Sequence, residues 1–269
     1  LYDLTISGGG TTSEIFGDTT IHRNMEAGGS ETVLRGALTV NGNLTVVGTL
    51  NTQYSSTDRN LTVTGELNLN GGTLTCNDSD VIVRNIYAFN GGTLSAPSNS
   101  STNGLEVTGE GTSGGGGGYS IRIEGATFTD NNGTVILSAD SNTFMRIESS
   151  LHNFIIRNDG SSSTRVHEFI NPTTIGGDLT LTNGSLQSYN ETWGINVTGH
   201  VLITKGQLGR SSATYNSSFG SLTISNDGTY VATSGTTTIT SKASTNFAFK
   251  NTGTFTHNSG TMQIGDGST

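Results

Sequence analysis

The sequence contains very little cysteine, proline and lysine, and it has no long apolar run. Cys76 is the single cysteine in 269 residues, so the chain forms no internal disulfide and lacks the paired spacings of zinc sites. No run of about 18 apolar residues occurs, so we expect no segment that inserts into a membrane. With only two prolines and 12% charged residues, the composition also differs from that of a disordered chain.

The shortage of positive charge excludes one large class of partners. Lysine and arginine total 12 against 21 acidic residues, which gives a formal net charge of −9. Proteins that bind nucleic acid or anionic membranes present a basic face, so we expect neither partner. The chain starts at Leu1 and shows no signal peptide, which indicates a processed product or an excised segment.

The residues that are abundant favour short β-strands joined by tight turns. Glycine occurs 39 times, and Val, Ile and Thr fall at alternating positions. Only 31% of the residues are apolar, which is little for a globular core. A solenoid needs fewer apolar residues because its core is a column only a few side chains wide.

A short phrase of two alternating apolar residues, a glycine and another apolar residue recurs along the chain. Its copies begin at Leu67, Tyr87, Leu179, Val201, Leu222 and Phe247. Within the two groups the copies lie 20 to 25 residues apart, a period typical of stacked arrays. We therefore predict an all-β fold, a single-chain parallel β-helix (β-solenoid), right-handed, with coils of about 20–25 residues.

The repeat also predicts how the chain is organised. A tighter six-residue repeat, with Gly and Leu in register, occupies 36–52, and we expect solenoid repeats throughout 36–269. Residues 1–35 are expected to form a cap or irregular start, with a short helix around 13–27. The glycine run predicts a loop or interruption near 112–119, and 145–175 departs from the repeat, so irregular coils are expected there.

Two similar charged segments predict an outer ladder. Ile121-Arg122-Ile123-Glu124 recurs 24 residues later as Met145-Arg146-Ile147-Glu148. If the two segments stack one coil apart, Arg122, Glu124, Arg146 and Glu148 share an outer face. That face is either a solvated set of paired charges or a patch that binds an anionic or polyhydroxyl ligand.

Carboxylates need attention because polysaccharide-cleaving enzymes often use this scaffold. A glycosidase requires two carboxyl groups that face each other across a sugar. The candidates for this chemistry, including one acid–base cluster, are Asp78 with Asp80, Glu106 with Glu110, and Arg165 with His167 and Glu168. Asp78-Ser79-Asp80 follows Asn77 and is equally typical of a turn. The turns expected of pectin-type enzymes are absent, and we predict no enzyme and no cofactor.

Cations, glycans and sugar rings are further possible ligands. Calcium could bind at the Asp- and Asn-rich turns, such as 130–133 and 226–228, although tight turns use these residues anyway. Three aromatic residues fall in the longer turns between repeats: Tyr189, Trp193 and Tyr215. If exposed, they could stack on sugar rings; otherwise they cover the core at a corner. Nine Asn-x-Ser/Thr sequons are possible glycosylation sites: Asn43, Asn60, Asn77, Asn99, Asn132, Asn183, Asn190, Asn196 and Asn216.

Two stretches resemble known repeat proteins. Residues 38–50, LTVNGNLTVVGTL, and 251–262, NTGTFTHNSGTM, look like segments of phage tail-fibre proteins, and they are similar to repeat regions of microbial surface adhesins. Such families form β-helices or trimeric β-fibres that serve as stalks and receptor-binding appendages. The resemblance implies no particular functional residue.

We therefore expect a non-enzymatic structural or adhesive rod, part of a fibre or surface appendage outside a cell or on a virion. Its expected partners are copies of itself, stacked end to end or as a trimer, and a surface glycan or receptor. The alternative is a carbohydrate-active β-helix that cleaves or binds polysaccharide.

Overall fold

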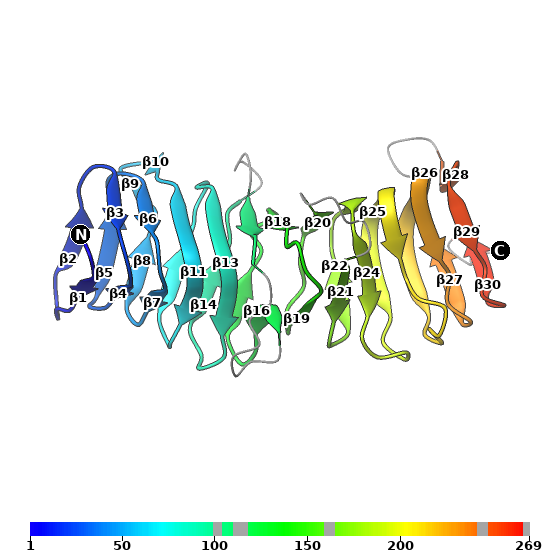
Figure 1. Ribbon diagram of the computed structural model, residues 1–269, viewed down its shortest axis with the longest axis horizontal. Helices are drawn as coiled ribbons and strands as arrows, with labels where there is room; N and C mark the ends of the chain where they lie inside the picture. The colour runs from blue at the N-terminus through cyan, green and yellow to red at the C-terminus, as the bar shows by residue number, and fades with distance from the viewer. Residues whose placement is uncertain (99–103, 110–117, 159–164, 241–246, 266–269) are drawn as a thin grey trace. The chain divides into compact units, whose positions relative to one another are not determined.

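The chain folds into two compact β-solenoid units, Leu1–Ile136 and Leu137–Thr269 (Figure 1). The computed structural model describes residues 1–98, 104–109, 118–158, 165–240 and 247–265. These residues form no helix, and nearly all of their strand pairs are parallel. The predicted fold class, a parallel β-solenoid, is confirmed, while its handedness stays a prediction.

Unit 1 has three faces, which we call A, B and C. Face A contains β1 (Leu4–Ile6), β4 (Met25–Ala27), β7 (Leu44–Val46), β16 (Tyr119–Ile123) and the second halves of β11 (Leu61–Leu69) and β13 (Val81–Ala88). Face B contains the first halves of β11 and β13 with β3 (Thr19–Ile21), β6 (Leu38–Val40) and β15 (Leu105–Val107). Face C contains β2 (Thr12–Ile15), β5 (Glu31–Leu34), β8 (Thr49–Asn51), β12 (Thr73–Thr75), β14 (Thr93–Ser95) and β17 (Thr127–Thr129). The strands β9 (Gln53–Tyr54) and β10 (Thr57–Asp58) form a small antiparallel hairpin.

Unit 2 repeats the three-faced plan with faces D, E and F. Face D contains β20 (Asn153–Arg157), β23 (Leu179–Asn183), β28 (Phe249–Asn251) and the middle parts of β25 (Ile195–Leu208) and β26 (Ser217–Val231). Face E contains β19 (Thr143–Ile147), β21 (Val166–Phe169), β24 (Ser185–Ser188), β29 (Thr254–Thr256) and the ends of β25 and β26. Face F contains β22 (Thr173–Ile175), β27 (Thr236–Ile239), β30 (Thr261–Ile264) and the starts of β25 and β26. The strand β18 (Thr134–Leu137) lies at the boundary in sequence.

The core of each unit consists of columns of like apolar side chains. In unit 1, Leu50, Leu74 and Leu94 occupy paired positions of three coils and are fully buried. Their neighbours along each strand point outward because side chains alternate across a β-sheet. These segments therefore form strands with one buried face, because Leu or Val on the inward side alternates with Thr on the outward side.

The observed register agrees with the predicted repeat in some coils and corrects it in others. Leu179, Val201 and Leu222 pair as predicted, 22 and 21 residues apart. In unit 1, however, Leu67 pairs with Ile86, so the predicted start at Tyr87 is wrong by one residue. Phe89, the second apolar position of the copy that starts at Tyr87, is accordingly 47% exposed. The last copy is also shifted, because Leu222 pairs with Phe249 and not with Phe247.

The first 35 residues contain paired strands, so the predicted helix around 13–27 is wrong, while a capping role for 1–35 stays a prediction. Residues 13–27 contain parts of strands β2, β3 and β4 in place of the expected helix, and β3 pairs in register with β6. The sequence pattern does not reveal the repeat in this segment, because small polar residues occupy many of its positions. The glycine run of the predicted interruption near 112–119 lies largely outside the described residues. The segment 145–175 contains β20, β21 and β22, with a register shift between Ile156 and Arg157, and the irregular coils expected there stay a prediction.

Asparagine and aspartate side chains tie each coil to the next at the corners of unit 1. Where face B turns into face A, the Oδ1 atom of Asp3 accepts a hydrogen bond from the backbone N–H of Asn24 at 3.0 Å. Asn24 Oδ1 accepts one from the N–H of Asn43, and Asn43 Oδ1 from the N–H of Glu66, both at 2.9 Å. The corner interrupts the backbone ladder, and these side chains replace the missing acceptors.

Unit 2 uses the same device. Asn153 Oδ1 accepts from the N–H of Asp178 at 2.9 Å, and Asp178 Oδ1 accepts from the N–H of His200 at 2.7 Å. At another corner Asn196 and Asn216 accept from the backbone N–H groups of the next coil, at 3.2 and 2.8 Å. Each such bond contributes about 1 kcal/mol to stability.

The residue that packs against each of these Asn or Asp side chains must be glycine, because there is no room for a Cβ atom. A Cβ atom at Gly65 would overlap Asn43 Oδ1 and the carbonyl oxygen of Gly42. A Cβ atom at Gly199 would overlap Asp178 Oδ1 in the same way. The glycines of the repeat therefore serve close contact between coils.

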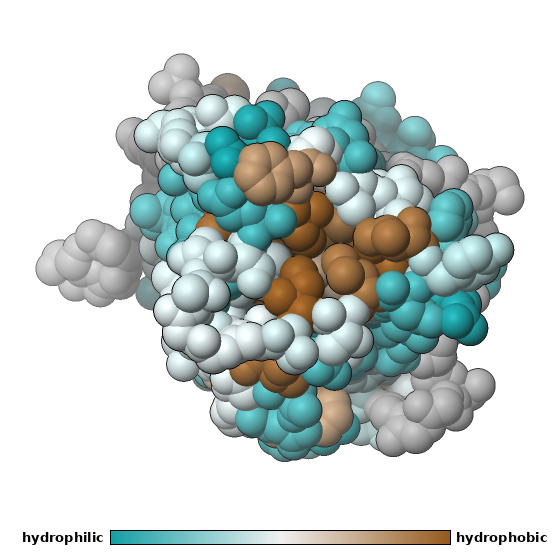
Figure 2. Space-filling model, turned by 90° about the vertical axis from the view of Figure 1, so that its left-hand side faces the viewer, coloured by the Kyte–Doolittle hydropathy of each residue, from teal (hydrophilic) through white to brown (hydrophobic). Residues whose placement is uncertain are grey.

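The first coil of unit 1 leaves part of the core uncovered. Figure 2 views this coil, and apolar atoms gather at its centre inside a polar ring. A hollow here is lined by Leu1, Leu4, Ile6, Ile15 and Phe16, among others. The view matches a core that is a narrow column.

The Gly65→Ala substitution tests the corner contact. We expect it to lower the free energy of unfolding by about 1–3 kcal/mol, because neighbouring backbone must move. Gly176→Ala is the matched control, since its Cβ atom would lie 3.6 Å from the nearest neighbour, an ordinary contact. Thermal unfolding followed by circular dichroism measures both, and equal midpoints for the two variants would contradict the argument.

Candidate ligand-binding groove

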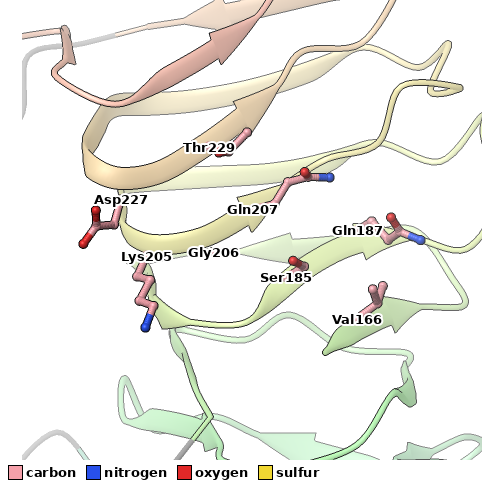
Figure 3. A pocket seen from close by; sticks show the side chains of 8 residues that line it. All are labelled: Val166, Ser185, Gln187, Lys205, Gly206, Gln207, Asp227 and Thr229. Carbon is pink, nitrogen blue, oxygen red and sulfur yellow. The ribbon is translucent and has the colours of Figure 1, made fainter. Parts of the chain in front are cut away.

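A shallow polar groove crosses face E of unit 2 (Figure 3). Its volume is about 660 Å³. We call it the face E groove, and its lining residues are Val166, Ser185, Gln187, Lys205, Gly206, Gln207, Asp227 and Thr229. They come from β21, β24, β25 and β26, so the groove runs across four coils.

One residue of the groove lining, Gly206, is a glycine in close contact with the neighbouring coils. Gly206 pairs with Gly228, and Gly184 lies against Gly206 in the preceding coil. Gly184 and Gly206 have φ values of +97° and +93°, a conformation that favours glycine. A Cβ atom at Gly206 would overlap the carbonyl oxygen of Gly184. Gly184 and Gly228 are themselves buried, so Gly206 is the only one of the three that lines the groove.

Two glutamine side chains in the groove are held in place. The Nε2 atom of Gln187 donates a hydrogen bond to Oε1 of Glu168, and Nε2 of Gln207 donates to the carbonyl oxygen of Gly209 at 2.8 Å. Each amide retains its carbonyl oxygen and a second N–H. The groove thus presents oriented acceptors and donors beside the hydroxyl groups of Ser185 and Thr229.

The charges at the edge of the groove balance. Lys205 and Asp227 occupy paired positions of β25 and β26 and are exposed. Figure 3 shows their side chains extending in different directions at the bend where the two strands turn. One positive and one negative group make the lining electrically neutral, in a protein whose net charge is −9.

An aromatic pair lies close to Gln187. Tyr189 is 56% exposed, and its ring makes an edge contact with Phe144, with centroids 5.7 Å apart. Gln187 and Tyr189 alternate with the buried Ser188, so both point outward. Arg210 donates to the carbonyl oxygen of Tyr189 at 3.0 Å and fixes that segment. Tyr215, by contrast, is buried and covers the core, and Trp193 is half-buried.

His167 is a core residue, so the predicted acid–base cluster does not form at the surface. It occupies the same inward column as Leu186 and is fully buried. Nδ1 lies 2.9 Å from Thr143 Oγ1, and Nε2 lies 3.0 Å from Asn158 Oδ1. A neutral ring protonated on Nε2 satisfies both contacts, and burial lowers its pKa to about 4. Arg165 is exposed, and Glu168 points outward to Gln187.

The other predicted carboxylates have structural surroundings. Asp78 lies in a turn and accepts a hydrogen bond from Ser98, and the backbone N–H of Asp80 donates to Asn60. Glu106 is on β15, and Glu110 lies outside the described residues. The structure therefore does not show these residues as one facing pair.

The charged segments pair internally. Arg122 binds Glu124 at 2.9 Å within unit 1, and Arg146 binds Glu148 at 3.0 Å within unit 2. Arg122 also lies over the ring of Phe89, 5.0 Å from its centroid. The predicted stacking of one pair on the other stays a prediction.

Several sequon asparagines take part in the fold. Asn43, Asn60, Asn196 and Asn216 accept backbone hydrogen bonds from the next coil. Four more behave differently: Nδ2 of Asn77 and Asn183 donates within the fold, Asn190 forms a local turn with Thr192, and Asn132 is exposed in a turn. Asn99 lies outside the described residues. Glycosylation itself stays a prediction.

In the described part of the chain, no group of three or more His, Cys, Asp or Glu side chains is placed to hold a metal ion. The calcium hypothesis, which also involves asparagine and backbone oxygens, stays a prediction. The same part of the chain contains no helix that is long and apolar enough to cross a membrane.

The fold alone defines the class of this protein, because comparison with known proteins finds no match. No protein-family model matches the chain, and no curated protein and no solved structure matches it either. The chain is a parallel β-solenoid with a polar groove on one face.

Sequence reasoning missed the groove, although one signal was present. Gly184, Gly206 and Gly228 are the glycines of three successive repeats, and the repeat by itself predicts only turns at these positions. The residue after each of them, Ser185, Gln207 or Thr229, points outward in a continuous row. These three residues form one surface only because β24, β25 and β26 pair in this register, which the sequence does not show.

Burial of His167 predicts acid sensitivity. Its folded-state pKa of about 4 lies below the ordinary value of 6.5, so the unfolded chain binds the proton more tightly. Stability is therefore full above pH 6.5 and falls by about 3 kcal/mol as the pH drops to 4. His200, whose pKa burial also lowers, adds in the same direction. Denaturant unfolding at pH 7.5, 5.5 and 4.5 should show a shallower decline for His167→Gln than for wild type, and equal declines would contradict this assignment.

Proposed function

We propose that this protein is a non-enzymatic structural or adhesive rod, part of an extracellular fibre or surface appendage. The observation that carries the proposal is the repeated hydrogen bonding from coil to coil. Parallel strands pair along the faces, and Asn and Asp side chains continue the bonding through the corners. A segment tied at both faces and corners has few places where it can open locally.

An appendage outside the cell must resist proteases, and it commonly does so with disulfides. This chain has only Cys76, which is buried, and burial raises the pKa of its thiol. Hydrogen bonding between coils offers a different source of resistance that needs no oxidation. This supports a durable scaffold, displayed on a cell or a virion, in contact with copies of itself.

A polysaccharide-cleaving role is less well supported. Such an enzyme needs an acid and a second carboxylate on either side of the bond that breaks. His167 is buried and neutral, and Asp78 and Asp80 are engaged in a turn and at a corner. The face E groove favours binding of a ligand more than its cleavage.

Protease resistance tests the proposal. Native protein should survive trypsin and proteinase K for hours, and Asn196→Ala/Asn216→Ala should be digested at least several times faster, because two coil-to-coil bonds are lost. Asn226→Ala is the matched control, since Asn226 is exposed on β26 and no side-chain hydrogen bond joins it to the described residues. Gel analysis over time gives the rates.

Two results would contradict the proposal. Rapid cleavage of the native chain within the paired strands would show that the coils do not protect it. Release of reducing ends from polysaccharides by wild-type protein would show that the chain is an enzyme. Electron microscopy of the same preparation should show filaments or trimers, and isolated monomers would remove self-assembly from the proposal.

A further inference from the structure

We infer that the face E groove binds a neutral polysaccharide, laid along the stacking direction across the coils of unit 2. The inference deepens the proposed adhesive role, on which it rests, by naming the site and the ligand class. The groove is open, polar and lined by residues from four strands.

The lining matches a polyhydroxyl ligand. A sugar ring presents hydroxyl groups that both donate and accept hydrogen bonds. The groove offers groups of the same dual kind, the hydroxyls of Ser185 and Thr229 and the amides of Gln187 and Gln207. Because both amides are already held through their Nε2 atoms, less side-chain freedom is lost on binding.

The row of lining residues runs in one direction. Val166, Ser185, Gln207 and Thr229 occupy paired positions of successive strands. Neighbouring strands lie about 4.8 Å apart, so similar polar groups recur at that spacing along the groove. An extended polymer can therefore use each coil in turn, whereas a compact small molecule would use one or two.

The balance of charge selects a neutral polymer. Lys205 and Asp227 occupy paired positions at the edge, so a charged polymer of either sign meets one group of like charge as well as one of opposite charge. The net charge of −9 further disfavours an anionic polymer. A neutral glycan meets neither penalty, since the Lys205 ammonium group can donate hydrogen bonds to its hydroxyls and the Asp227 carboxylate can accept hydrogen bonds from them.

A peptide ligand fits this surface less well. Peptides commonly add to a sheet through unpaired backbone groups. Here the backbone N–H groups of Ser185, Gln207 and Gly209 already donate to the preceding coil. The lining also lacks the apolar pockets that hold peptide side chains, since Val166 is its only large apolar member.

The aromatic edge completes the match. Tyr189 is exposed beside Gln187, and Phe144 holds its ring from the side. An aromatic face packs well against the C–H face of a sugar while its hydroxyl stays in water. This places a stacking position next to the hydrogen-bonding floor.

A glycan array with matched variants tests the inference. The probes are linear neutral hexasaccharides of glucose, mannose, galactose and xylose, with oligogalacturonate and heparin as anionic probes. Wild type should bind at least one neutral hexasaccharide, and isothermal titration should show at least a tenfold loss for Thr229→Tyr, which fills the groove, and for Gln207→Ala. Thr223→Tyr is the control, because Thr223 is an equally half-buried outward residue of the same strand on face D. It should bind as wild type does.

The outcomes separate this inference from the proposed function. Absence of binding to every neutral hexasaccharide, binding of anionic probes alone, or equal affinity of Thr229→Tyr and Thr223→Tyr would each overturn the groove assignment. Protease resistance does not depend on the groove, so it would survive these results. Binding followed by release of reducing ends would instead keep the groove and overturn the non-enzymatic role.

Discussion

The hydrogen bond that an Asn or Asp side chain accepts from a backbone N–H group of the next coil is the interaction on which this structure depends. Strands pair easily along flat faces, but at a corner the chain bends and the backbone ladder is interrupted. Asn43 at one corner and Asp178 at another supply acceptors for the next coil. The glycine beside each of them is required because any Cβ atom would occupy the place of the carboxamide or carboxylate oxygen.

The same requirement shapes the surface. Glycine allows neighbouring coils to approach closely, and Gly206, which lies against Gly184 in this way, is also one of the residues that line the face E groove. Stability and a candidate binding surface thus have a common origin in the repeat. A thin core permits this, because the outward half of every strand is left for polar residues whose identity packing does not dictate.

Much of the fold could be predicted because alternation and spacing are local properties. The copies at Leu179, Val201 and Leu222 gave the correct register, since their glycines and apolar residues recur with little variation. The prediction failed at Tyr87, where Ile86 and Ala88 form an equally good alternating pair one residue earlier, and a shift of one residue exchanges the two faces. The expected helix around 13–27 was also wrong, because Ser, Thr and Gly give a weak hydrophobic signal there.

The sequence by itself determined the fold class, the approximate coil length and the polar character of the exterior, because these follow from composition and periodicity. Only the tertiary structure decided which residues meet across coils. It placed His167 in the core beside Leu186 and assigned four sequon asparagines to structural hydrogen bonds. It also brought Ser185, Gln207 and Thr229 into one row. These contacts join residues about 20 apart, and the lengths of the intervening turns, which no local pattern fixes, decide their alignment.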